Sequence, residues 1–413
     1  MRRLLTAHAP ETCSLDFDGE AVPAHPGDTV ASALIAAGAL MTSRGPKYRR
    51  PRGAYCLLGD CGTCLVRVDG EPNVRACLTP VRAGMRVASQ NSYGDLDPTA
   101  LIDAVFRGGI DHHHMVVYPR VANQMMQGVA RNLTGFGELP DAAPAAPATC
   151  VQHAPEVLIV GAGLAGGAAD ELLRRAGADV RVFDRRAGIR VFAAYPHEGV
   201  WAASEQVEGA APTLHLARPR HVILALGAHT PTIPVPGNDI PGVVAARGLR
   251  DLLRRTGRTL AVPVVVIGSG AEAEAHAAAL SAKLVAPADV VRIAGRRRVK
   301  AVETNNGRLA CRLVALAPDP APAFELAAQA GVQVRWTGAG FAPVCAADGR
   351  AELRRHDHPL GHGEHPAEPP WTLWIAGELR GDCSPADAPA SGRAVATAIL
   401  RALGQPVPEA SHV

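Results

Sequence analysis

The stretch Cys56-Leu-Leu-Gly-Asp-Cys61-Gly-Thr-Cys64 places three cysteines in one short loop, and a fourth, Cys77, follows after twelve further residues. This C-x4-C-x2-C…C spacing is typical of a plant-type [2Fe–2S] site, in which four thiolates hold two tetrahedral irons. Gly59 and Gly62 allow the backbone to wrap closely, so that amide N–H groups can point at the sulfur atoms. The pattern therefore predicts that Cys56, Cys61, Cys64 and Cys77 bind an iron–sulfur cluster.

A zinc knuckle and a disulfide pair are the alternative interpretations of these cysteines. Structural zinc usually has two pairs of the C-x2-C kind, whereas here three cysteines crowd one loop, which favours the iron–sulfur interpretation. Three arginines lie nearby in the sequence and would offset the negative charge of a cluster: Arg52, Arg67 and Arg75.

The residues around the cysteine loop follow the order of a β-grasp ferredoxin. Residues 12–22 alternate apolar and polar side chains about a turn at Asp18-Gly19, which predicts a hairpin. A turn with a capping residue at 26–29 precedes a short apolar helix that begins at Val30 and ends near Gly38. With the strand-like run 65–68 after the loop, these elements predict an α+β ferredoxin-like domain over residues 1–95.

Composition restricts the remaining function classes. The 413 residues correspond to about two to four domains, and a net charge of +3 offers no case for nucleic-acid binding. We find no apolar run long enough to span a bilayer and no signal-peptide h-region at the N-terminus. The five other cysteines are scattered without a pairing pattern, so we expect a reducing, cytoplasmic location: Cys13, Cys150, Cys311, Cys345 and Cys383.

Residues 96–154 read as a connecting segment. Leu101–Phe106 has a helical pattern, and the Pro/Ala-rich run Asp141–Thr149 marks a domain boundary. His112, His113 and His114 are adjacent, so they cannot all face one metal from a helix or a strand, and we assign them no ligand role. The histidine-rich stretch 356–365 reads as a surface loop, and we assign it no role either.

A dinucleotide fingerprint begins the next part of the chain. The strand-like run 156–160 leads into Gly161-Ala-Gly163-Leu-Ala-Gly166, a helical stretch, and a second strand that ends at Asp184. Gly161 makes the turn, Gly163 lets a pyrophosphate approach the helix N-terminus, and Gly166 permits close packing of helix and strand. Asp184 is placed to bond ribose hydroxyls. The alternative is a Rossmann-like unit without a ligand, because a fold does not imply a function.

A second fingerprint is incomplete. Val264-Val-Val-Ile-Gly268-Ser-Gly270 has no third glycine, and no acidic residue ends a second strand after its helix. A nicotinamide dinucleotide would lack its ribose partner, so this unit is interpreted as structural and NAD(P) is not expected. The basic run 296–298 reads as a solvated turn.

Several motifs resemble one family along nearly the whole chain, namely the α subunits of heterotetrameric sarcosine oxidase and their relatives. The relatives are the multi-subunit amino-acid, opine and proline dehydrogenases and hydrogen cyanide synthase. The motifs are Phe17-Asp-Gly through Gly27-Asp-Thr-Val-Ala-Ser-Ala-Leu, Lys47-Tyr-Arg-Arg-Pro-Arg-Gly53, Gly70-Glu-Pro-Asn-Val-Arg-Ala-Cys77, Leu226-Gly-Ala-His229-Thr-Pro and Pro236-Gly-Asn-Asp-Ile-Pro-Gly242.

The resemblance implies a division of labour between subunits. A separate β subunit of the D-amino-acid-oxidase type, with its own flavin, oxidises the amine of an amino acid, and the α subunit receives the electrons. The α subunit binds FAD in a two-dinucleotide-domain fold, and some members have an FMN at the subunit interface. Mapped onto this sequence, the FAD-binding positions are Gly161, Gly163, Gly166, Asp184, Gly227, Gly377 and Glu378.

This sequence departs from the family pattern in several respects, one of which is that Glu378 stands where the family usually has aspartate. Sarcosine oxidase α subunits usually lack the cluster cysteines, so their presence favours the dehydrogenase relatives. The segment after Asp184 and the second dinucleotide unit are also shorter than in the family. We therefore expect a ferredoxin-like domain followed by an α/β module of two shortened dinucleotide-binding units. The FAD-type unit covers 155–247 and 372–405, and the degenerate NAD(P)-type unit covers 248–371.

The function expected from these features is that of an electron-transfer subunit in a hetero-oligomeric flavoprotein. It would pass electrons from a partner flavin through its own flavin and [2Fe–2S] cluster to an acceptor. One alternative is a structural partner subunit in which only the cluster is redox-active. The other is a self-sufficient NAD(P)H-dependent ferredoxin reductase.

Overall fold

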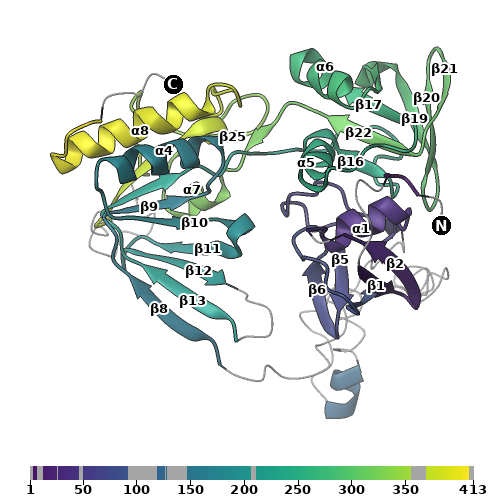
Figure 1. The fold of residues 1–413 in the computed structure, drawn as a ribbon, viewed down its shortest axis with the longest axis horizontal. Helices are drawn as coiled ribbons and strands as arrows, with labels where there is room; N and C mark the ends of the chain where they lie inside the picture. Colours follow the sequence, from purple (N-terminus) through teal and green to yellow (C-terminus); the bar gives the residue numbers. More distant parts are fainter. Residues whose placement is uncertain are drawn as a thin grey trace. The chain divides into compact units, whose positions relative to one another are not determined.

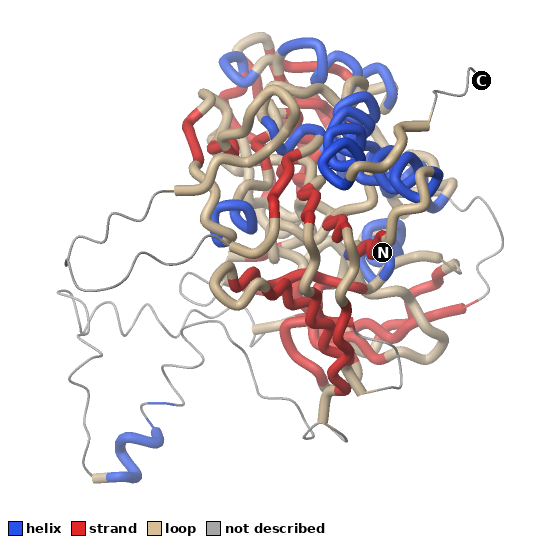
Figure 2. The backbone as a smooth tube through the Cα atoms, turned by 90° about the vertical axis from the view of Figure 1, so that its left-hand side faces the viewer, coloured by secondary structure: helices blue, strands red, loops and turns tan. Residues whose placement is uncertain are grey.

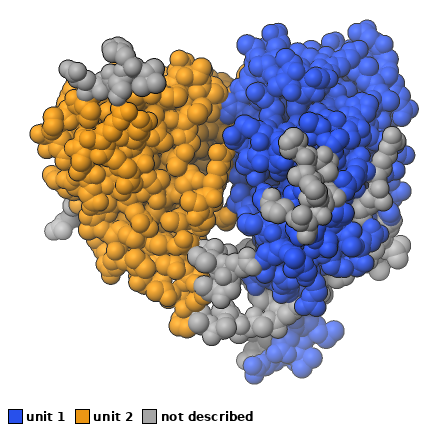
Figure 3. Space-filling model, in the orientation of Figure 1, with its two compact units in different colours: residues 1–143, 232–318 blue, residues 144–231, 319–413 orange. Residues whose placement is uncertain are grey.

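A computed structural model describes residues 3–6, 13–25, 27–45, 50–91, 119–125, 127, 147–205, 211–354 and 369–408 of the chain (Figure 1). Strands and helices both contribute to these residues (Figure 2). The chain divides into two compact units, residues 1–143 with 232–318 and residues 144–231 with 319–413 (Figure 3). Each unit is described by itself below.

The first part of unit 1 is a β-grasp fold. Its five-stranded sheet has the order β2-β1-β7-β5-β6, with β1 and β7 parallel and the other pairs antiparallel. A two-stranded pair, β3 with β4, precedes the cysteine loop. The bounds are β1 Cys13–Phe17, β2 Glu20–Ala24, α1 Val30–Ala37, β3 Ser43–Arg44, β4 Pro51–Arg52, β5 Leu65–Val68, β6 Glu71–Arg75 and β7 Arg86–Ser89.

Local sequence explains the predicted hairpin and helix, and the structure confirms both. Asp18 and Gly19 adopt φ values of 52° and 85°, which suit the tight turn between β1 and β2. Thr29 and Ser32 form a reciprocal capping box at the start of α1. Gly38 ends the helix in the left-handed region, with φ 83°.

The second part of unit 1 contains a four-stranded parallel sheet of order β16-β22-β17-β18 and a three-stranded antiparallel sheet of order β19-β20-β21. The strand β17 is buried along its whole length, as is usual for a parallel strand covered on both faces. The bounds are β16 Val243–Ala245, α5 Ala246–Thr256, β17 Val264–Gly268, α6 Gly270–Ala279, β18 Lys283–Val285, η2 Pro287–Asp289, β19 Val290–Gly295, β20 Val299–Thr304, β21 Gly307–Ala310 and β22 Leu313–Ala317.

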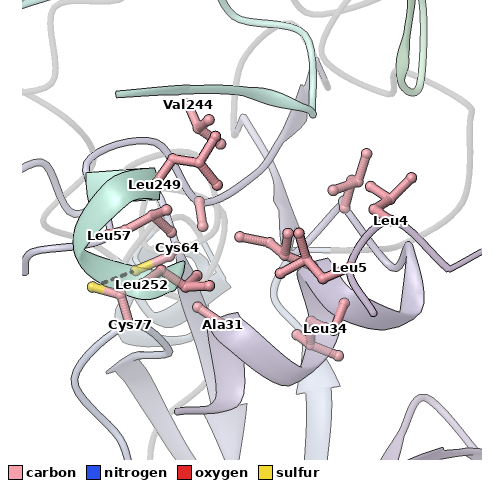
Figure 4. Packing of buried hydrophobic residues seen from close by; sticks show 14 of the residues in the cluster. Leu4, Leu5, Ala31, Leu34, Leu57, Cys64, Cys77, Val244, Leu249 and Leu252 are labelled. Atoms are coloured by element: carbon pink, nitrogen blue, oxygen red, sulfur yellow. Dashed lines mark hydrogen bonds between the residues drawn. The ribbon is translucent and has the colours of Figure 1, made fainter. Parts of the chain in front are cut away.

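One hydrophobic core joins the two parts of unit 1. It contains residues of the β-grasp fold, such as Leu34 and Val66, together with residues of the second part, such as Leu249 and Leu313. Near the N-terminus, Leu5 forms a β-bridge with Leu260. The β-grasp fold and the second part of unit 1, the NAD(P)-type or second nucleotide-type fold, therefore share one buried cluster, part of which is drawn in Figure 4.

Unit 2 consists of three layers. A parallel sheet of order β10-β9-β14-β26 lies between helices α4 and α8 on one face and an antiparallel-rich sheet of order β11-β12-β13-β8 on the other. Alternate residues of β9 face the two layers: Val157 and Ile159 pack with the helices, while Leu158 and Val160 pack with the second sheet. In Figure 1 the helices α4 and α8 lie together along their length.

The bounds in unit 2 are β8 Thr149–His153, β9 Val157–Val160, α4 Leu164–Arg175, β10 Val180–Phe183, η1 Arg185–Ala187, β11 Ile189–Tyr195, β12 Val200–Glu205, β13 Thr213–Ala217, β14 His221–Leu224, β15 Ala228–His229, β23 Ala321–Pro322, α7 Glu325–Gln329, β24 Val334–Trp336, β25 Phe341–Pro343, β26 Thr372–Ile375, η3 Gly377–Arg380 and α8 Ala388–Leu403.

The boundaries between the two nucleotide-type folds differ between the structure and the sequence analysis. Strand β16 pairs with β22, so residues 232–247 belong with the NAD(P)-type fold of unit 1 and not with the FAD-type fold of unit 2. Residues 319–354 belong with the FAD-type unit, because Ala327, Ala330 and Val332 pack into its core. Strand pairing and core packing decide these boundaries, and neither is visible in a local pattern.

Three sequence features lie outside the described residues. They are the helical pattern 101–106, the histidines 112–114 and the histidine-rich stretch 356–365.

Candidate functional site

The four predicted cluster ligands come together in unit 1. Three of them lie in the loop between β4 and β5, and Cys77 follows β6. The sulfur atoms of Cys64 and Cys77 are 3.4 Å apart, as the dashed line in Figure 4 shows. Cys56, Cys64 and Cys77 are buried, whereas Cys61 is exposed. Three of the four thiols therefore lie in the interior of unit 1, and Cys61 lies at its surface.

Backbone amides of the loop point at the sulfur atoms. The N–H groups of Asp60 and Cys61 donate to Cys56 Sγ over 3.3 and 3.4 Å, and the Cys56 N–H donates to Cys61 Sγ over 3.5 Å. Gly59 and Gly62 have φ values of 90° and 65°, which turn the backbone around the sulfurs. Such N–H···S bonds are the ones that tune iron–sulfur clusters.

The electrostatics of the loop favour a thiolate. Hydrogen bonds from the Cys61 and Cys77 thiols lower the pKa of Cys56, and the bond that Cys61 makes to Cys56 raises the pKa of Cys61. In the ranges that the structure describes, no three His, Cys, Asp or Glu side chains converge on a single ion site. The Cys56 thiol is hydrogen-bonded to those of Cys61 and Cys77, and the Cys64 thiol to that of Cys77, so the four thiols form one connected group.

Thr63 is a residue of this site that the sequence analysis missed. Its hydroxyl oxygen lies 3.2 Å from Cys61 Sγ and accepts a hydrogen bond of 3.2 Å from the Tyr55 N–H. A signal was present in the sequence, because Thr63 stands between two ligands in Cys61-Gly-Thr-Cys64. The three predicted charge-compensating arginines, Arg52, Arg67 and Arg75, lie on the strands β4, β5 and β6 that flank the loop.

The predicted FAD-binding residues of unit 2 lie at one edge of its parallel sheet. Gly161 follows β9, Asp184 follows β10, Gly227 closely follows β14, and Gly377 closely follows β26. All pairings in this sheet are parallel, so the carboxyl ends of the four strands meet at the same edge. This edge is the usual position of ligands in open α/β sheets.

Each fingerprint glycine has a separate steric role. A Cβ at Gly161, where φ is 96°, would come 2.5 Å from the Ala225 carbonyl oxygen. A Cβ at Gly166 would overlap the Gly161 carbonyl oxygen, so only glycine allows α4 to approach the strand. Gly163 caps α4 without a side-chain hydrogen bond, and a Cβ there would meet nothing within 4 Å. The helix N-terminus thus faces open space of the kind a pyrophosphate fills.

Asp184 supports this glycine turn directly. Its carboxylate accepts hydrogen bonds of 2.7 Å from the Ala162 N–H and 2.7 Å from the Arg186 N–H, one on each oxygen. A carboxylate has about four acceptor positions, so it can also accept ribose hydroxyls. Across the edge, Gly227 and Gly377 have φ values of 70° and 68°, and Glu378 lies in η3. The residues present fit an FAD-type dinucleotide.

The second fingerprint, in unit 1, has a different environment. Ala273 takes the place of the third glycine and is buried, and β18 is followed by Ala286-Pro287 without an acid. Glu272 lies in the first turn of α6, where Arg247 and His276 bond its carboxylate. Burial raises the pKa of Glu272, but its hydrogen bonds to His276 and Arg247 outweigh this and bring it to about 2. The carboxylate therefore remains ionised beside the N-terminus of α6.

Comparison with known proteins gives a family match over each of the two regions that contain these residues. Residues 11–92 match the family described as "2Fe-2S iron-sulfur cluster binding domain", and residues 159–230 match "NAD(P)-binding Rossmann-like domain". Hydrogen cyanide synthase subunit HcnA of Pseudomonas aeruginosa is 39% identical over 82 residues, which are 20% of this chain and 78% of that protein. Sarcosine oxidase subunit alpha of Rhizobium meliloti is 28% identical over 412 residues, 78% of this chain and 41% of that protein.

The chain belongs to the family of sarcosine oxidase α subunits and HcnA subunits. The resemblance seen in the sequence is thereby confirmed. The L-proline dehydrogenase structure from P. horikoshii has the same fold, with a TM-score of 0.65 at 17% identity over 99% of this chain and 77% of that one. The predicted fold class, a ferredoxin-like domain followed by dinucleotide-type units, is confirmed as well.

The chain matches only a part of the length of its longer relatives. The chain spans 41% of the length of the Rhizobium meliloti subunit. Within the described residues, no helix combines the length and the apolar character needed to cross a bilayer. The family is one of oxidoreductases.

Proposed function

We propose that this chain is the electron-transfer subunit of a multi-subunit flavoprotein dehydrogenase or oxidase acting on the CH–NH group of amino acids or other amines. Its partner would be a flavoprotein β subunit of the D-amino-acid-oxidase type, in a cytoplasmic hetero-oligomer. The names of the relatives, sarcosine oxidase, hydrogen cyanide synthase and L-proline dehydrogenase, support this substrate class. The observation that carries the proposal is the cysteine loop, with paired sulfurs and N–H donors directed at them.

The residues of unit 1 would hold a [2Fe–2S] cluster through Cys56, Cys61, Cys64 and Cys77, and such a cluster supplies one-electron transfer. The amides of Asp60 and Cys61 stabilise negative charge on Cys56 Sγ, and this would favour the reduced state of the cluster. Burial of three of the four sulfurs keeps water from the ligands, and the exposed Cys61 marks the edge open to a redox partner.

The residues of unit 2 would hold FAD. The N-terminus of α4 at Gly163 would take the pyrophosphate, and Asp184 would bind the adenosine ribose. Gly227, Gly377 and Glu378 would line the rest of the same sheet edge. The chain would thus bring two redox cofactors into one subunit, while amine oxidation occurs in the partner.

Cofactor analysis of the purified chain tests this proposal. We expect about two irons and two acid-labile sulfides per chain, together with FAD released on denaturation. Cys61→Ala should abolish the EPR signal of the reduced cluster, whereas the matched control Cys150→Ala, at an exposed cysteine of β8, should leave it unchanged. A reduced-state signal that survives Cys61→Ala would show that the ligands are others.

A structural partner subunit is the second candidate function. It is favoured by the short path after Asp184, where only η1 separates β10 from β11. In this case the purified chain would contain the cluster but no flavin. Co-purification with a tagged flavoprotein partner distinguishes both candidates from a self-sufficient reductase, which would need no partner.

A further inference from the structure

Helix α5 of the second nucleotide-type fold lies directly on the cysteine loop of the β-grasp fold. Gly248, in the first turns of α5, is the point of closest approach. A Cβ at this position would overlap the carbonyl oxygen of Cys56 and would come 3.0 Å from the Cβ of Leu57. Glycine at this position therefore lets the helix backbone touch the peptide that carries the first cluster ligand.

The residue after that ligand has a strained conformation. Leu57 has a φ of 59°, in the left-handed region that bulky residues rarely adopt. Its side chain is 4% exposed and belongs to the same buried cluster as Leu249 and Leu252 of α5. Figure 4 shows these three leucines beside Cys64 and Cys77. Such a conformation persists only where the surroundings hold it, and here α5 supplies a large part of the surroundings.

The residue before the ligand is also held by the second fold. The Ala245 N–H, at the end of β16, donates a 2.8 Å hydrogen bond to the Tyr55 carbonyl oxygen. The Tyr55 phenol is hydrogen-bonded to Thr232, and its burial raises the pKa of the phenol. Backbone atoms on both sides of Cys56 are therefore placed by residues 232–249, which are distant in sequence from the loop.

We propose that helix α5, through Gly248, positions Cys56 and so sets the environment of the cluster that the proposed function requires. The second nucleotide-type fold then supports the cysteine loop by packing against it, and this support requires no bound nucleotide. Gly248 is a positioning residue: it touches neither iron nor sulfide, and it acts through the Cys56 peptide. The orientation of the Cys56 side chain, and with it the two N–H···S bonds from Asp60 and Cys61, depends on this peptide.

The substitution Gly248→Ala tests the proposal. The atom that the new methyl group meets is a backbone carbonyl oxygen, so no side-chain rotation can relieve the overlap. We expect the iron content per chain to fall at least twofold, with shifted g values and a shifted midpoint potential in the cluster that remains. Wild-type iron content, g values and potential in the variant would overturn the proposal.

Gly392→Ala is the matched control. Gly392 lies in α8 of unit 2, and a Cβ there would overlap the Ala165 carbonyl oxygen in the same way. All four tryptophans, Trp201, Trp336, Trp371 and Trp374, belong to unit 2, so their fluorescence reports on that unit. We expect Gly392→Ala to change the thermal unfolding seen by fluorescence and to leave the cluster signals unchanged. Equal changes in the cluster signals of Gly248→Ala and Gly392→Ala would overturn the proposal, because they would show that any destabilising substitution disturbs the cluster.

A milder variant covers the case in which Gly248→Ala does not fold. Leu249→Ala leaves Gly248 and the backbone contact in place but removes a fully buried α5 side chain from the cluster that contains Leu57. We expect a folded protein with a shifted midpoint potential, whereas Leu173→Ala, at a fully buried leucine of α4 in unit 2, should not shift it. An unshifted potential in Leu249→Ala would overturn the proposal. Absence of iron from the wild-type chain would instead refute the proposed function.

Discussion

The hydroxyl group of Thr63 faces a sulfur atom that has to carry negative charge. Its oxygen accepts the Tyr55 N–H, so the hydroxyl proton is left to point elsewhere, and Cys61 Sγ is 3.2 Å away. A cluster-bound cysteine is a thiolate and has no proton to donate, so Thr63 is the donor when the cluster is present. A hydrogen bond to a ligand sulfur stabilises the reduced, more negative state.

We therefore predict that Thr63→Val lowers the midpoint potential of the cluster. A tenfold fall in the ratio of reduced to oxidised cluster at a fixed solution potential would correspond to about 59 mV for one electron. An EPR-monitored redox titration measures this ratio. Thr63→Ser should restore most of the wild-type value, and the control Thr79→Val, which removes a hydroxyl bonded to the Arg75 carbonyl oxygen, should not change it. An unchanged potential in Thr63→Val would contradict the prediction.

Asp184 combines support of the glycine turn with the expected contact to a ribose. Replacing it with alanine removes two charge-assisted hydrogen bonds to backbone amides. A hydrogen bond to a charged group contributes about 1.5–3 kcal/mol, so loss of the one expected ribose contact should weaken FAD binding in Asp184→Ala about tenfold to a hundredfold. Titration of the flavin-free protein, followed by flavin fluorescence, gives the dissociation constant.

Asp170→Ala is the control for this measurement. Asp170 lies on α4 and pairs with Arg174 four residues later, away from the glycine turn. Its loss should leave FAD affinity within about twofold of the wild type, because exposed pairs of this kind contribute less than 1 kcal/mol. Similar affinities in Asp184→Ala and wild type would remove Asp184 from the set of proposed binding residues.

At the scale of single residues, the sequence indicates which side chains come together better than it indicates which residues support them. That the four cysteines lie close together could be predicted because one short loop carries three of them. Gly248 could not be predicted, because its role depends on the approach of a helix that is far away along the chain. Thr63 is intermediate. Its position between two cysteines indicates a role near the sulfurs, but the direction of its hydroxyl proton can be inferred only from the hydrogen bond that the Tyr55 N–H donates to its oxygen.

The first turn of α6 has the backbone geometry of a nucleotide-binding turn but lacks some of the side chains that would bind a nucleotide. Gly268 is required sterically, since a Cβ there would overlap the Ala317 carbonyl oxygen, so the close strand–helix packing is preserved. The ionised Glu272 carboxylate, bonded by Arg247, adds a negative charge near the helix N-terminus where a pyrophosphate would bind. The missing acid after β18 opposes a nicotinamide dinucleotide, because the ribose would have no carboxylate partner.

We therefore predict that NADH and NADPH do not reduce the isolated chain. Visible absorbance of the oxidised cluster should remain unchanged on anaerobic addition of either nucleotide at about 1 mM, the upper end of usual KM values. Dithionite in the same cuvette should bleach it, which shows that the cluster is reducible. Bleaching by NADH would support the interpretation as a self-sufficient reductase.

The elements of the fold were predicted more reliably than their grouping. The hairpin β1–β2, the helix α1 and the strand–turn–helix at Gly161 follow from local alternation, capping and glycine spacing. The membership of β16 in the second sheet does not, because it depends on pairing with β22 about seventy residues later. Long-range pairing of this kind leaves no local periodic signal in the sequence.

For the whole molecule, the main departure from expectation is that unit 1 joins two modules that sequence analysis treats as separate domains. The shared core is accompanied by hydrogen bonds between the modules, such as Thr6 N–H to the Thr259 carbonyl oxygen over 2.9 Å. A buried core common to both modules implies that they unfold together. The cluster of unit 1 and the tryptophans of unit 2 offer separate probes, so the cooperativity of each unit can be followed independently.

The ion pair between Asp28 and Arg258 provides the sharpest test of this common unfolding. The two side chains are 0% exposed and 2.6 Å apart, and they join the start of α1 to the residue after the C-cap of α5. Burial raises the pKa of Asp28, but hydrogen bonds from the Arg258 guanidinium, the His25 N–H and the Ser32 hydroxyl outweigh it, so the pKa lies below its ordinary value of 3.8.

Asp28→Asn should lower the free energy of unfolding of unit 1 by about 3 kcal/mol at pH 7, because it leaves the Arg258 charge buried without its counter-ion. A depressed carboxyl pKa contributes stability above the unfolded pKa and loses it as the pH falls through the folded value. The difference between wild type and variant should therefore be constant from pH 7 to pH 5 and shrink below about pH 4. Hydrogen exchange of the α5 and β7 amides, compared between the two proteins at each pH, measures it, because this readout does not need the acid-labile cluster.

The control for this measurement is Asp251→Asn, at the partly exposed partner of Arg254 and Arg255 on the outer side of α5. It should cost about 1 kcal/mol or less. Tryptophan fluorescence should show the same unfolding of unit 2 in all three proteins. If Asp28→Asn destabilised only the β-grasp fold, hydrogen exchange of the α5 amides would remain slow while that of β1 and β7 became fast. Joint acceleration in α5, β17 and β7 is the result expected for one cooperative unit, since amides of a single unit exchange at the same free energy of opening.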